Sequence, residues 1–440
     1  MTKIIIDETK KLGKIKPMHG VGQPPLMGVS TGKFSYLTEA NIPYSRLHDV
    51  GGWFGKNMFV DIPNIFRDFD ADENDPNSYD FTFTDILVKG LVDAGCEPYY
   101  RLGVTIENFA PIKAYRIYPP KDFHKWARIC EHIIRHYNEG WADGFHFNIK
   151  YWEIWNEPEF HYDIMKNAMW RGTKEEYFEL YRISSTHLKE CFGDTIKIGG
   201  GSSNGFHRII YPENNVPGKT DEWYGQIDYI MEFFYDFIDF VKRENLPLDF
   251  FAHHIYENVQ NAVKMELFCE KYFEEKGLSD VEIHINEWNT RRVERYIEQG
   301  TSLACADMVA TMCYMQNTKA AVMCYYDAKI GTSAFGGLFN PATRMPYCAY
   351  YGFKAFGKLY TLGTQIECVC DNEKVVSIAA TDGTTVGVLM SNIGEDTEIE
   401  LSANGKFKAF LIDEKNSFSS VDMDDNRIKL KQNQVLYFEN

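Results

Sequence analysis

The sequence predicts an α/β protein in which a (β/α)8 TIM barrel precedes a small accessory β-sandwich domain. Two features of the 440-residue chain lead to this prediction. Eight short apolar segments, each ended by glycine or polar residues, alternate with eight segments of helical periodicity between residues 15 and 359. After Tyr360 the pattern changes to short β-like runs separated by Asp-Gly, Asp-Asn and Asn-Gly turns.

The expected barrel alternates strands with helices along the chain. The expected strands are Ile15–Gly20, Ile42–Asp49, Glu97–Gly103, Tyr151–Glu157, Ile196–Ser202, Asp249–Tyr256, Glu282–Trp288 and Ala321–Asp327. The expected helices are Phe34–Ala40, Phe83–Ala94, Asp122–Tyr137, Lys174–Cys191, Ile227–Glu244, Val259–Lys276, Leu303–Gln316 and Pro346–Leu359. A doubly wound open sheet is the rival fold, but the glycines of Met27–Lys33 lack the spacing of its phosphate loop.

The accessory domain is expected to be entirely β. Its expected strands are Glu367–Cys370, Lys374–Thr381, Thr385–Asn392, Glu398–Leu401, Lys406–Ile412 and Gln434–Phe438. This number is low for closing two sheets, and Lys3–Asp7 near the other terminus is available as one more strand. We therefore expect a barrel of residues 13–359 and an accessory domain of residues 1–12 with 360–440, packed rigidly because no flexible linker separates them.

Composition and charge limit the partners of the chain. With 44% hydrophobic residues it can bury a large core. A formal net charge of -17 argues against nucleic acid and anionic membranes, which both attract Lys and Arg. The apolar run at residues 4–6 is too short for a signal peptide, so a cytoplasmic location is expected. The ten scattered cysteines suit reduced thiols.

Two expected strands end in a glutamate, and these endings suggest the chemistry. Glu157 follows the alternating run 151–155, comes directly after Asn156 and is followed by Pro158. Glu287 ends the run 281–286 in the same way, again after an asparagine. A lone glutamate after a strand can equally be an ion-pair partner or a helix cap. Two of them are what a retaining glycosidase needs, one as proton donor and one as nucleophile.

Further polar residues gather at the carboxyl ends of the expected strands, where barrels of this kind place their chemistry. These residues are Arg46, His48, Asp49, Arg101, Asn156, Glu157, His253, His254, Tyr256, Glu287, Tyr326 and Asp327. Any one of them could be a satisfied core residue. His253 and His254 alternate across the sheet, so at least one must point away from the site. A buried Arg46 beneath two carboxylates is best explained as a charge that keeps the nucleophile ionised.

With these motifs in place, the chain resembles the glycoside hydrolases of clan A, and in finer detail family 39. The resemblance lies in Arg46-Leu47-His48, in the run from Lys150 to Pro158, in the run from Asp249 to Tyr256, and in Asn286-Glu287-Trp288-Asn289. It extends from about residue 15 to 360. It implies a retaining glycosidase with Glu157 as the general acid/base and Glu287 as the nucleophile.

The same resemblance implies the residues that bind the sugar. Asn156 would contact the sugar 2-hydroxyl, and Tyr256 would donate a hydrogen bond to the nucleophile. The remaining residues expected to bind substrate are Arg46, His48, His254, Trp288 and Asp327. The chain departs from the family's β-xylosidases at the eighth strand, where they have an acidic pair and this chain has Asp327 and Lys329. That departure weakens the expectation of xylose as the substrate.

The sequence therefore predicts a retaining, exo-acting enzyme that cleaves β-linked xylosides or related small oligosaccharides. The alternatives are an endo-acting glycanase, an α-L-arabinofuranosidase of the same clan and a non-catalytic carbohydrate-binding protein. The sequence leaves the oligomeric state open, and a homo-oligomer is one of the choices. No cofactor and no metal are expected. The pairs His132 with His136 and Cys368 with Cys370 lack the further ligands of a metal site. Trp53 and Phe109 are candidate sugar platforms or loop anchors.

Overall fold

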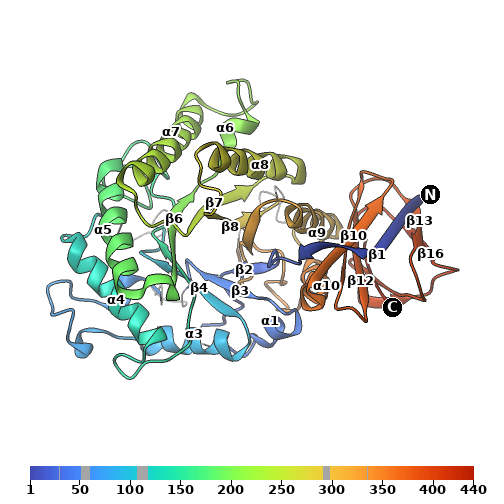
Figure 1. Ribbon diagram of the computed structural model, residues 1–440, viewed down its shortest axis with the longest axis horizontal. Coiled ribbons are helices and arrows are strands. Elements are labelled where there is room, and N and C mark those ends of the chain that lie inside the picture. Colours follow the sequence, from blue (N-terminus) through green and yellow to red (C-terminus); the bar gives the residue numbers. More distant parts are fainter. Residues whose placement is uncertain (29, 51–59, 107–116, 291–297, 334) are drawn as a thin grey trace.

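Eight parallel strands close into a barrel in the computed structural model, which describes the whole chain except residues 29, 51–59, 107–116, 291–297 and 334. The strands are β2 (Gly20–Gly22), β3 (Tyr44–Leu47), β4 (Glu97–Leu102), β5 (Tyr151–Ile154), β6 (Lys197–Ser203), β7 (Phe250–Tyr256), β8 (Glu282–Asn289) and β9 (Ala320–Tyr325). Each strand pairs with the next, and β9 pairs with β2. The predicted barrel is confirmed, and helices surround its strands (Figure 1).

The helices follow the expected alternation. They are α1 (Ser35–Glu39), α2 (Ile62–Ile65), α3 (Thr82–Asp93), α4 (Phe123–Asn138), α5 (Lys174–Phe192), α6 (His207–Ile210), α7 (Asp221–Glu244), α8 (Val259–Glu275), α9 (Ser302–Gln316) and α10 (Cys348–Leu362). Helix α7 begins earlier than predicted because the Thr220 side chain caps it by accepting a hydrogen bond from the backbone of Trp223. Among the described helices, none is both long and apolar enough to cross a membrane.

The first barrel strand differs from the prediction. Strand β2 begins at Gly20, whereas Ile15–Gly20 was the expected range. Pro17 lies inside the expected range and cannot donate a backbone hydrogen bond to a neighbouring strand. At Gly20 the chain comes so close to β9 that a Cβ atom would lie 2.5 Å from the carbonyl oxygen of Met323. The strand therefore starts where glycine permits this close approach.

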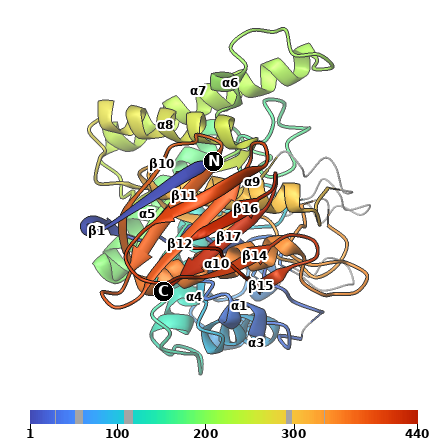
Figure 2. The same ribbon diagram turned by 90° about the vertical axis from the view of Figure 1, so that its right-hand side faces the viewer.

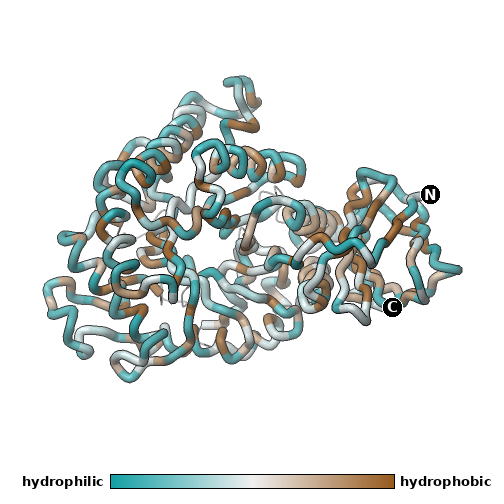
Figure 3. Tube along the Cα trace, viewed as in Figure 1, coloured by the Kyte–Doolittle hydropathy of each residue, from teal (hydrophilic) through white to brown (hydrophobic). Residues whose placement is uncertain are grey.

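Aromatic rings pack one part of the barrel interior. Tyr99, Tyr151, Phe250 and His284 come from four different strands, and their ring centroids lie between 4.6 and 5.7 Å apart. All four are buried. Figure 3 shows hydrophobic residues recurring along the strands and the helices that cover them. Because the interior is filled with side chains, chemistry is confined to the carboxyl ends of the strands.

The remaining strands form one nine-stranded sheet beside the barrel, and both chain termini lie on it (Figures 1 and 2). Its strands are β1 (Thr2–Lys14), β10 (Thr364–Cys370), β11 (Val375–Thr381), β12 (Val386–Asn392), β13 (Thr397–Ser402), β14 (Lys408–Ile412), β15 (Ser417–Val421), β16 (Arg427–Leu430) and β17 (Val435–Glu439). The N-terminal strand joins this sheet, antiparallel to β10 and parallel to β13. The sheet curls around its own apolar core, so the expected all-β unit is present as one continuous curled sheet.

The centre of this sheet is buried on both faces. Every residue of β12 is buried. Val388 and Met390 point into the core of the sheet, while Leu389 belongs to the large core shared with the barrel. The Ser391 hydroxyl donates a hydrogen bond of 2.7 Å to the carbonyl oxygen of Ala306 in α9. The contact between sheet and barrel is thus apolar and close-packed, as the absence of a flexible linker suggests.

Candidate active site

The backbone after β5 places Glu157 at the mouth of the barrel. The strand ends at Ile154, earlier than predicted, and Trp155 and Glu157 both have positive φ angles, of 68° and 40°. Left-handed backbone is unfavourable for residues with a Cβ atom and persists only where neighbours fix it. Here the backbone N–H of Glu157 donates to the carbonyl oxygen of Ser202 at 3.1 Å. This anchoring directs a nearly buried carboxyl group toward the adjacent strands.

Glu287 on β8 is the second carboxylate of the site and is also nearly buried. It accepts hydrogen bonds from Arg46 Nη1 at 2.7 Å and from the Tyr256 hydroxyl at 2.8 Å, and His254 Nδ1 lies 3.4 Å away. Burial alone would raise the pKa of Glu287, but His254, Arg46 and the Tyr256 hydrogen bond outweigh it and hold that pKa below its usual value. Glu287 is therefore kept ionised.

Arg46 organises the floor of the site from β3. Its guanidinium donates to Glu153 at 2.8 Å, to Glu287 at 2.7 Å, to Asn156 Oδ1 at 2.5 Å and to Ser202 Oγ at 3.0 Å. Burial by itself would lower the pKa of Arg46, but the two carboxylates raise it above its usual value. Because arginine only donates, the oxygen of Asn156 must face it, which turns the amide nitrogen of Asn156 in the other direction.

The acid group of Glu157 pairs with His254 from β7. His254 Nδ1 lies 2.6 Å from Glu157 Oε1. Burial and the negative charge of Glu287 raise the pKa of Glu157 above its usual value, although His254 opposes the rise. Within the group Glu157, His254 and Glu287, the facing carboxylate and imidazole atoms all lie within 4.8 Å of one another. One carboxyl group thus tends to hold a proton beside another that does not.

The hydrogen bonds around Ser202 orient His254. The Ser202 hydroxyl donates to Glu153 Oε1 at 2.6 Å, so its oxygen can accept from His254 Nε2 at 3.2 Å, and Nδ1 then faces Glu157. Burial by itself would lower the pKa of His254, but the negative charges of Glu287 and Glu157 raise it above its usual value. The imidazole thus tends to hold a proton on both nitrogens, and its Nδ1–H donates to Glu157 Oε1.

His48 links the nucleophile side of the site to Asp49. Its Nδ1 accepts a hydrogen bond from Arg101 Nε at 3.2 Å, so Nε2 carries the proton. Nε2 lies 3.2 Å from Asp49 Oδ1 and 3.9 Å from Glu287 Oε1. Burial, with Arg101 and Arg46 nearby, holds the pKa of His48 well below its usual value, so the ring is neutral. Burial and the charge of Glu287 raise the pKa of Asp49 to about 7.

Comparison with known proteins identifies the family of a barrel with this pair of carboxylates. The family model for glycosyl hydrolases family 39 matches residues 3–326, which is most of the chain. The chain belongs to glycosyl hydrolases family 39. The resemblance found in the sequence motifs is therefore confirmed.

Several relatives of the family 39 chain have a name or a solved structure. A β-xylosidase from Caldicellulosiruptor saccharolyticus is 25% identical over 228 residues, which are 50% of this chain and only 37% of that relative's length. A glucosidase structure from Croceicoccus marinus has a TM-score of 0.77 at 17% identity and covers 100% of this chain and 98% of its own. A family 39 β-xylosidase structure from Caulobacter crescentus has a TM-score of 0.70 at 16% identity, covering 99% of each chain.

The family 39 barrel brings together most of the residues expected to act. Glu157, Glu287 and the expected neighbours share one network at the strand ends, and those neighbours are Arg46, His48, Asn156, His254 and Tyr256. His253 points away, as the alternation requires, and pairs with Glu266 of α8 at 2.8 Å. Trp53 and Phe109 lie outside the described residues.

Two expected substrate-binding residues make contacts outside this network. Trp288 is buried behind β8, where its ring packs against Tyr325 and Phe353 with centroids 5.2 and 6.2 Å away. A strand exposes alternate faces, so the residue after an inward-pointing Glu287 turns outward. The Asp327 carboxylate accepts hydrogen bonds from the Ser333 hydroxyl and the Lys329 backbone, both in its own loop. These contacts make Trp288 part of the core and Asp327 a loop anchor.

Glu153 is the main contributor that the sequence argument missed. It is completely buried and accepts hydrogen bonds from Arg46, Ser202 and Asn286. Its signal in the sequence was a single glutamate in the middle of an apolar strand. A buried charge of that kind needs a partner of opposite charge, and Arg46 on a neighbouring strand supplies it.

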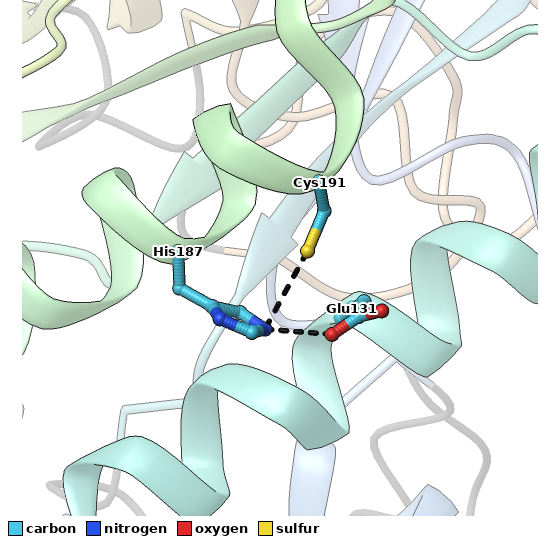
Figure 4. A group of neighbouring side chains, drawn as sticks. All are labelled: Glu131, His187 and Cys191. Carbon is cyan, nitrogen blue, oxygen red and sulfur yellow. Dashed lines mark hydrogen bonds and ion pairs between the residues drawn. The ribbon is translucent and has the colours of Figure 1, made fainter.

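Two groups in the described part of the chain have the residue types of a metal site. One is the active-site group itself. The other joins Glu131 of α4 to His187 and Cys191 of α5 (Figure 4). His187 Nε2 lies 2.6 Å from Glu131 Oε2, closer than two ligands on one tetrahedral zinc ion, which would be about 3.3 Å apart. Arg135 also donates to Glu131 at 2.8 Å. These contacts are those of an ion-pair network.

The histidine pair of α4 is also explained by protein contacts. His136 Nε2 lies 3.0 Å from Asp85, and its Nδ1 lies 2.9 Å from the carbonyl oxygen of Trp141. The His132 ring packs against Trp141, with centroids 4.5 Å apart. The two imidazoles are thus engaged separately by protein groups.

Proposed function

We propose that this protein is a retaining glycoside hydrolase that cleaves β-linked glycosides, xylosides or related small oligosaccharides, through a covalent glycosyl-enzyme. The observation that carries the proposal is the pair Glu157 and Glu287, with facing atoms within 4.8 Å and pKa values shifted in opposite directions. Retaining enzymes have carboxyl groups about 5 to 5.5 Å apart, whereas inverting enzymes need about 6.5 to 9.5 Å to admit a water molecule. The spacing therefore favours retention.

In the first step Glu157 is the acid and Glu287 the nucleophile. A carboxylate oxygen of Glu287 bonds to the anomeric carbon, and the bond from that carbon to the leaving-group oxygen breaks. The proton of Glu157 passes to that oxygen, so the aglycone departs as a neutral alcohol. Arg46 and Tyr256 hold the Glu287 carboxylate in position while its charge is consumed.

In the second step the roles follow from the change in charge. Once Glu287 is an ester, its negative charge no longer raises the pKa of Glu157, and His254 favours an ionised Glu157. Glu157 can then accept a proton from water as the water oxygen bonds to the anomeric carbon. The ester bond breaks, Glu287 regains its carboxylate, and the sugar leaves with its original configuration.

The names of the relatives support the first substrates to test. One relative in sequence is a β-xylosidase, and the two similar structures are a glucosidase and a β-xylosidase. The site residues lie on the strands from β3 to β8 or directly after them, so we assign catalysis to residues 13–359. We assign residues 1–12 with 360–440 to an accessory domain.

The test is an activity screen with a stereochemical readout. Purified protein is assayed on aryl β-xyloside, β-glucoside, β-galactoside, α-arabinofuranoside and α-arabinopyranoside, with Glu287→Ala as the control. We expect turnover of a β-glycoside that the variant loses. Proton NMR of the first product should show the β-anomer, and an α-anomer formed first would exclude retention. Activity of Glu287→Ala close to that of the wild type would refute the assignment of the nucleophile.

A further inference from the structure

Asp49 is a carboxylate at the mouth of the barrel that the proposed reaction does not use. It follows β3 directly, and its backbone has a φ of 56°. About a seventh of its side chain is exposed, 14% compared with 7% for Glu287 and 9% for Glu157. Asp49 is thus the more accessible of the three carboxyl groups at this end of the barrel.

Two chains of contacts end at Asp49. On one side Arg101 donates to His48, and His48 Nε2 lies 3.2 Å from Asp49 Oδ1. On the other side Gln23 Nε2 donates to the Tyr326 hydroxyl at 2.5 Å, and that hydroxyl donates to Asp49 Oδ2 at 2.9 Å. Every donor in these chains is buried or nearly so. The carboxylate is therefore held in one orientation as an acceptor.

The acceptor sites on Asp49 are not all used by the protein. An ionised carboxylate offers two acceptor positions on each oxygen. The backbone N–H of Ile106 donates to Oδ1 at 3.3 Å, and His48 Nε2 lies 3.2 Å from the same oxygen. Tyr326 occupies one position on Oδ2. Among the described residues, the remaining position on Oδ2 has no donor, and it belongs to a partly exposed group.

Asp49 lies beside the reacting centre. The proton-bearing Nε2 of His48 is 3.2 Å from Asp49 and 3.9 Å from Glu287, so a single imidazole nitrogen separates the two carboxylates. A sugar ring whose anomeric carbon is at Glu287 carries hydroxyl groups that can extend from Glu287 as far as Asp49. We propose that Asp49 is a specificity-determining residue of the sugar subsite, whose Oδ2 accepts a hydrogen bond from a hydroxyl of the glycone.

This inference rests on the proposed function and narrows its substrate class. The pKa of Asp49 is raised to about 7, so above that pH the carboxylate is mostly ionised and can only accept, and the group that meets it must be a donor. A neutral sugar with a free hydroxyl at that position fits, and the corresponding deoxy sugar leaves the carboxylate without that partner. Above the same pH a uronic acid with its carboxylate at that position is disfavoured, because it offers no donor and repels both Asp49 and Glu287.

The test compares the wild type with Asp49→Gly, because glycine adopts a φ of 56° without strain and removes the carboxylate. The substrates are the preferred aryl glycoside and its series of monodeoxy analogues. A hydrogen bond to a charged group contributes about 1.5 to 3 kcal/mol, so one analogue should lower the wild-type kcat/KM by about 10- to 150-fold. In Asp49→Gly the same analogue should react within about twofold of the parent.

Asp61→Asn is the matched control. Asp61 is buried behind the site and accepts hydrogen bonds from Arg101 and from the Thr105 backbone, at 2.7 and 2.9 Å. It belongs to the same network but lies beyond Arg101, so its variant should lower the rates of the parent and of every analogue by a common factor. If Asp49→Gly also lowers all rates by one factor, Asp49 has only a structural role and the inference is overturned.

A binding measurement separates this inference from the proposed function. Calorimetry with the free monosaccharides and their deoxy forms needs no turnover. If the wild type cleaves no glycoside but discriminates a sugar from its deoxy form, and Asp49→Gly does not, the proposed function fails and the Asp49 subsite stands. If the wild type discriminates in neither assay, the subsite is refuted as well.

Discussion

Tyr256→Phe tests how the site keeps its nucleophile ionised. The hydroxyl of Tyr256 donates to Glu287 Oε2 at 2.8 Å, and its removal leaves Arg46 and His254 as the remaining cationic or donor contacts. Phenylalanine keeps the ring that packs against Phe335, with centroids 5.4 Å apart. The substitution therefore changes one hydrogen bond while conserving the packing around it.

The magnitude follows from the charge of the acceptor. A hydrogen bond to an ionised group contributes about 1.5 to 3 kcal/mol, and one pKa unit corresponds to about 1.4 kcal/mol. Loss of the Tyr256 donor should thus raise the pKa of Glu287 by about 1 to 2 units. A higher pKa leaves more of the nucleophile protonated in acid. The acid limb of the pH dependence of kcat/KM should move upward by the same 1 to 2 units.

The assay is the pH profile of kcat/KM on the preferred aryl glycoside. Tyr325→Phe is the control, since the Tyr325 hydroxyl bonds to Asn289 and to the carbonyl oxygen of Gly336 behind the strand. That control should leave the acid limb in place. If the acid limb of Tyr256→Phe coincides with that of the wild type, Tyr256 does not govern the ionisation of Glu287 and our account of the site is wrong.

Three further variants test other parts of the account. Glu157→Ala should lower kcat/KM for substrates with poor leaving groups by about 10²- to 10⁴-fold, while the first step on activated aryl glycosides is spared. With added azide the variant should form a β-glycosyl azide. Rates that respond neither to the leaving group nor to azide would exclude the acid/base role. Burial raises the pKa of Glu159 from 4.5 to about 7, so the folded state loses stability as pH rises through this range. Glu159→Gln should therefore raise Tm, measured by scanning fluorimetry, by about 3 to 4 °C at pH 8 and by about 1 °C at pH 5. An equal change in Tm at both pH values would contradict the raised pKa. Arg46→Lys keeps the positive charge, but an ammonium group lacks the planar guanidinium that bonds to both Glu153 and Glu287. The variant should therefore lower Tm by about 3 to 5 °C and kcat/KM by more than tenfold. Rates like those of the wild type would show that the charge alone suffices.

The barrel could be predicted because its pattern is local. Each strand is a short apolar run with a polar end, and each helix has its own periodicity, so seven of the eight strand positions needed only small changes at their ends. The remaining strand, β2, is the first of the barrel, and it was misplaced because its three residues carry almost no pattern. Strands β15 and β16 were missed for a related reason: they are rich in serine and charge, and they are defined by pairing with β14 and β13.

The site residues could be predicted where their position at the end of a strand already indicates their role. The two glutamates and their donors stand at strand ends and could be found by position alone. The outward turn of Trp288 follows from the alternation of side chains along β8 once Glu287 points inward, so the expectation that Trp288 binds substrate neglected this alternation. The role of Glu153 depends on a distant arginine, and the free acceptor position of Asp49 depends on a count of hydrogen bonds.

The two buried arginines explain why neighbouring carboxyl groups behave differently in one site. Each is tied to a fully buried or nearly buried carboxylate that substrate cannot reach, Arg46 to Glu153 and Arg101 to Asp61. Only Arg46 also reaches a reactive group, Glu287. A carboxyl group without such a contact is dominated by desolvation and by the charge of its neighbour, and so it tends to hold its proton. Arg46 uses one N–H for Glu153 and another for Glu287. The contact with Arg46 therefore makes Glu287 the nucleophile and leaves Glu157 as the acid.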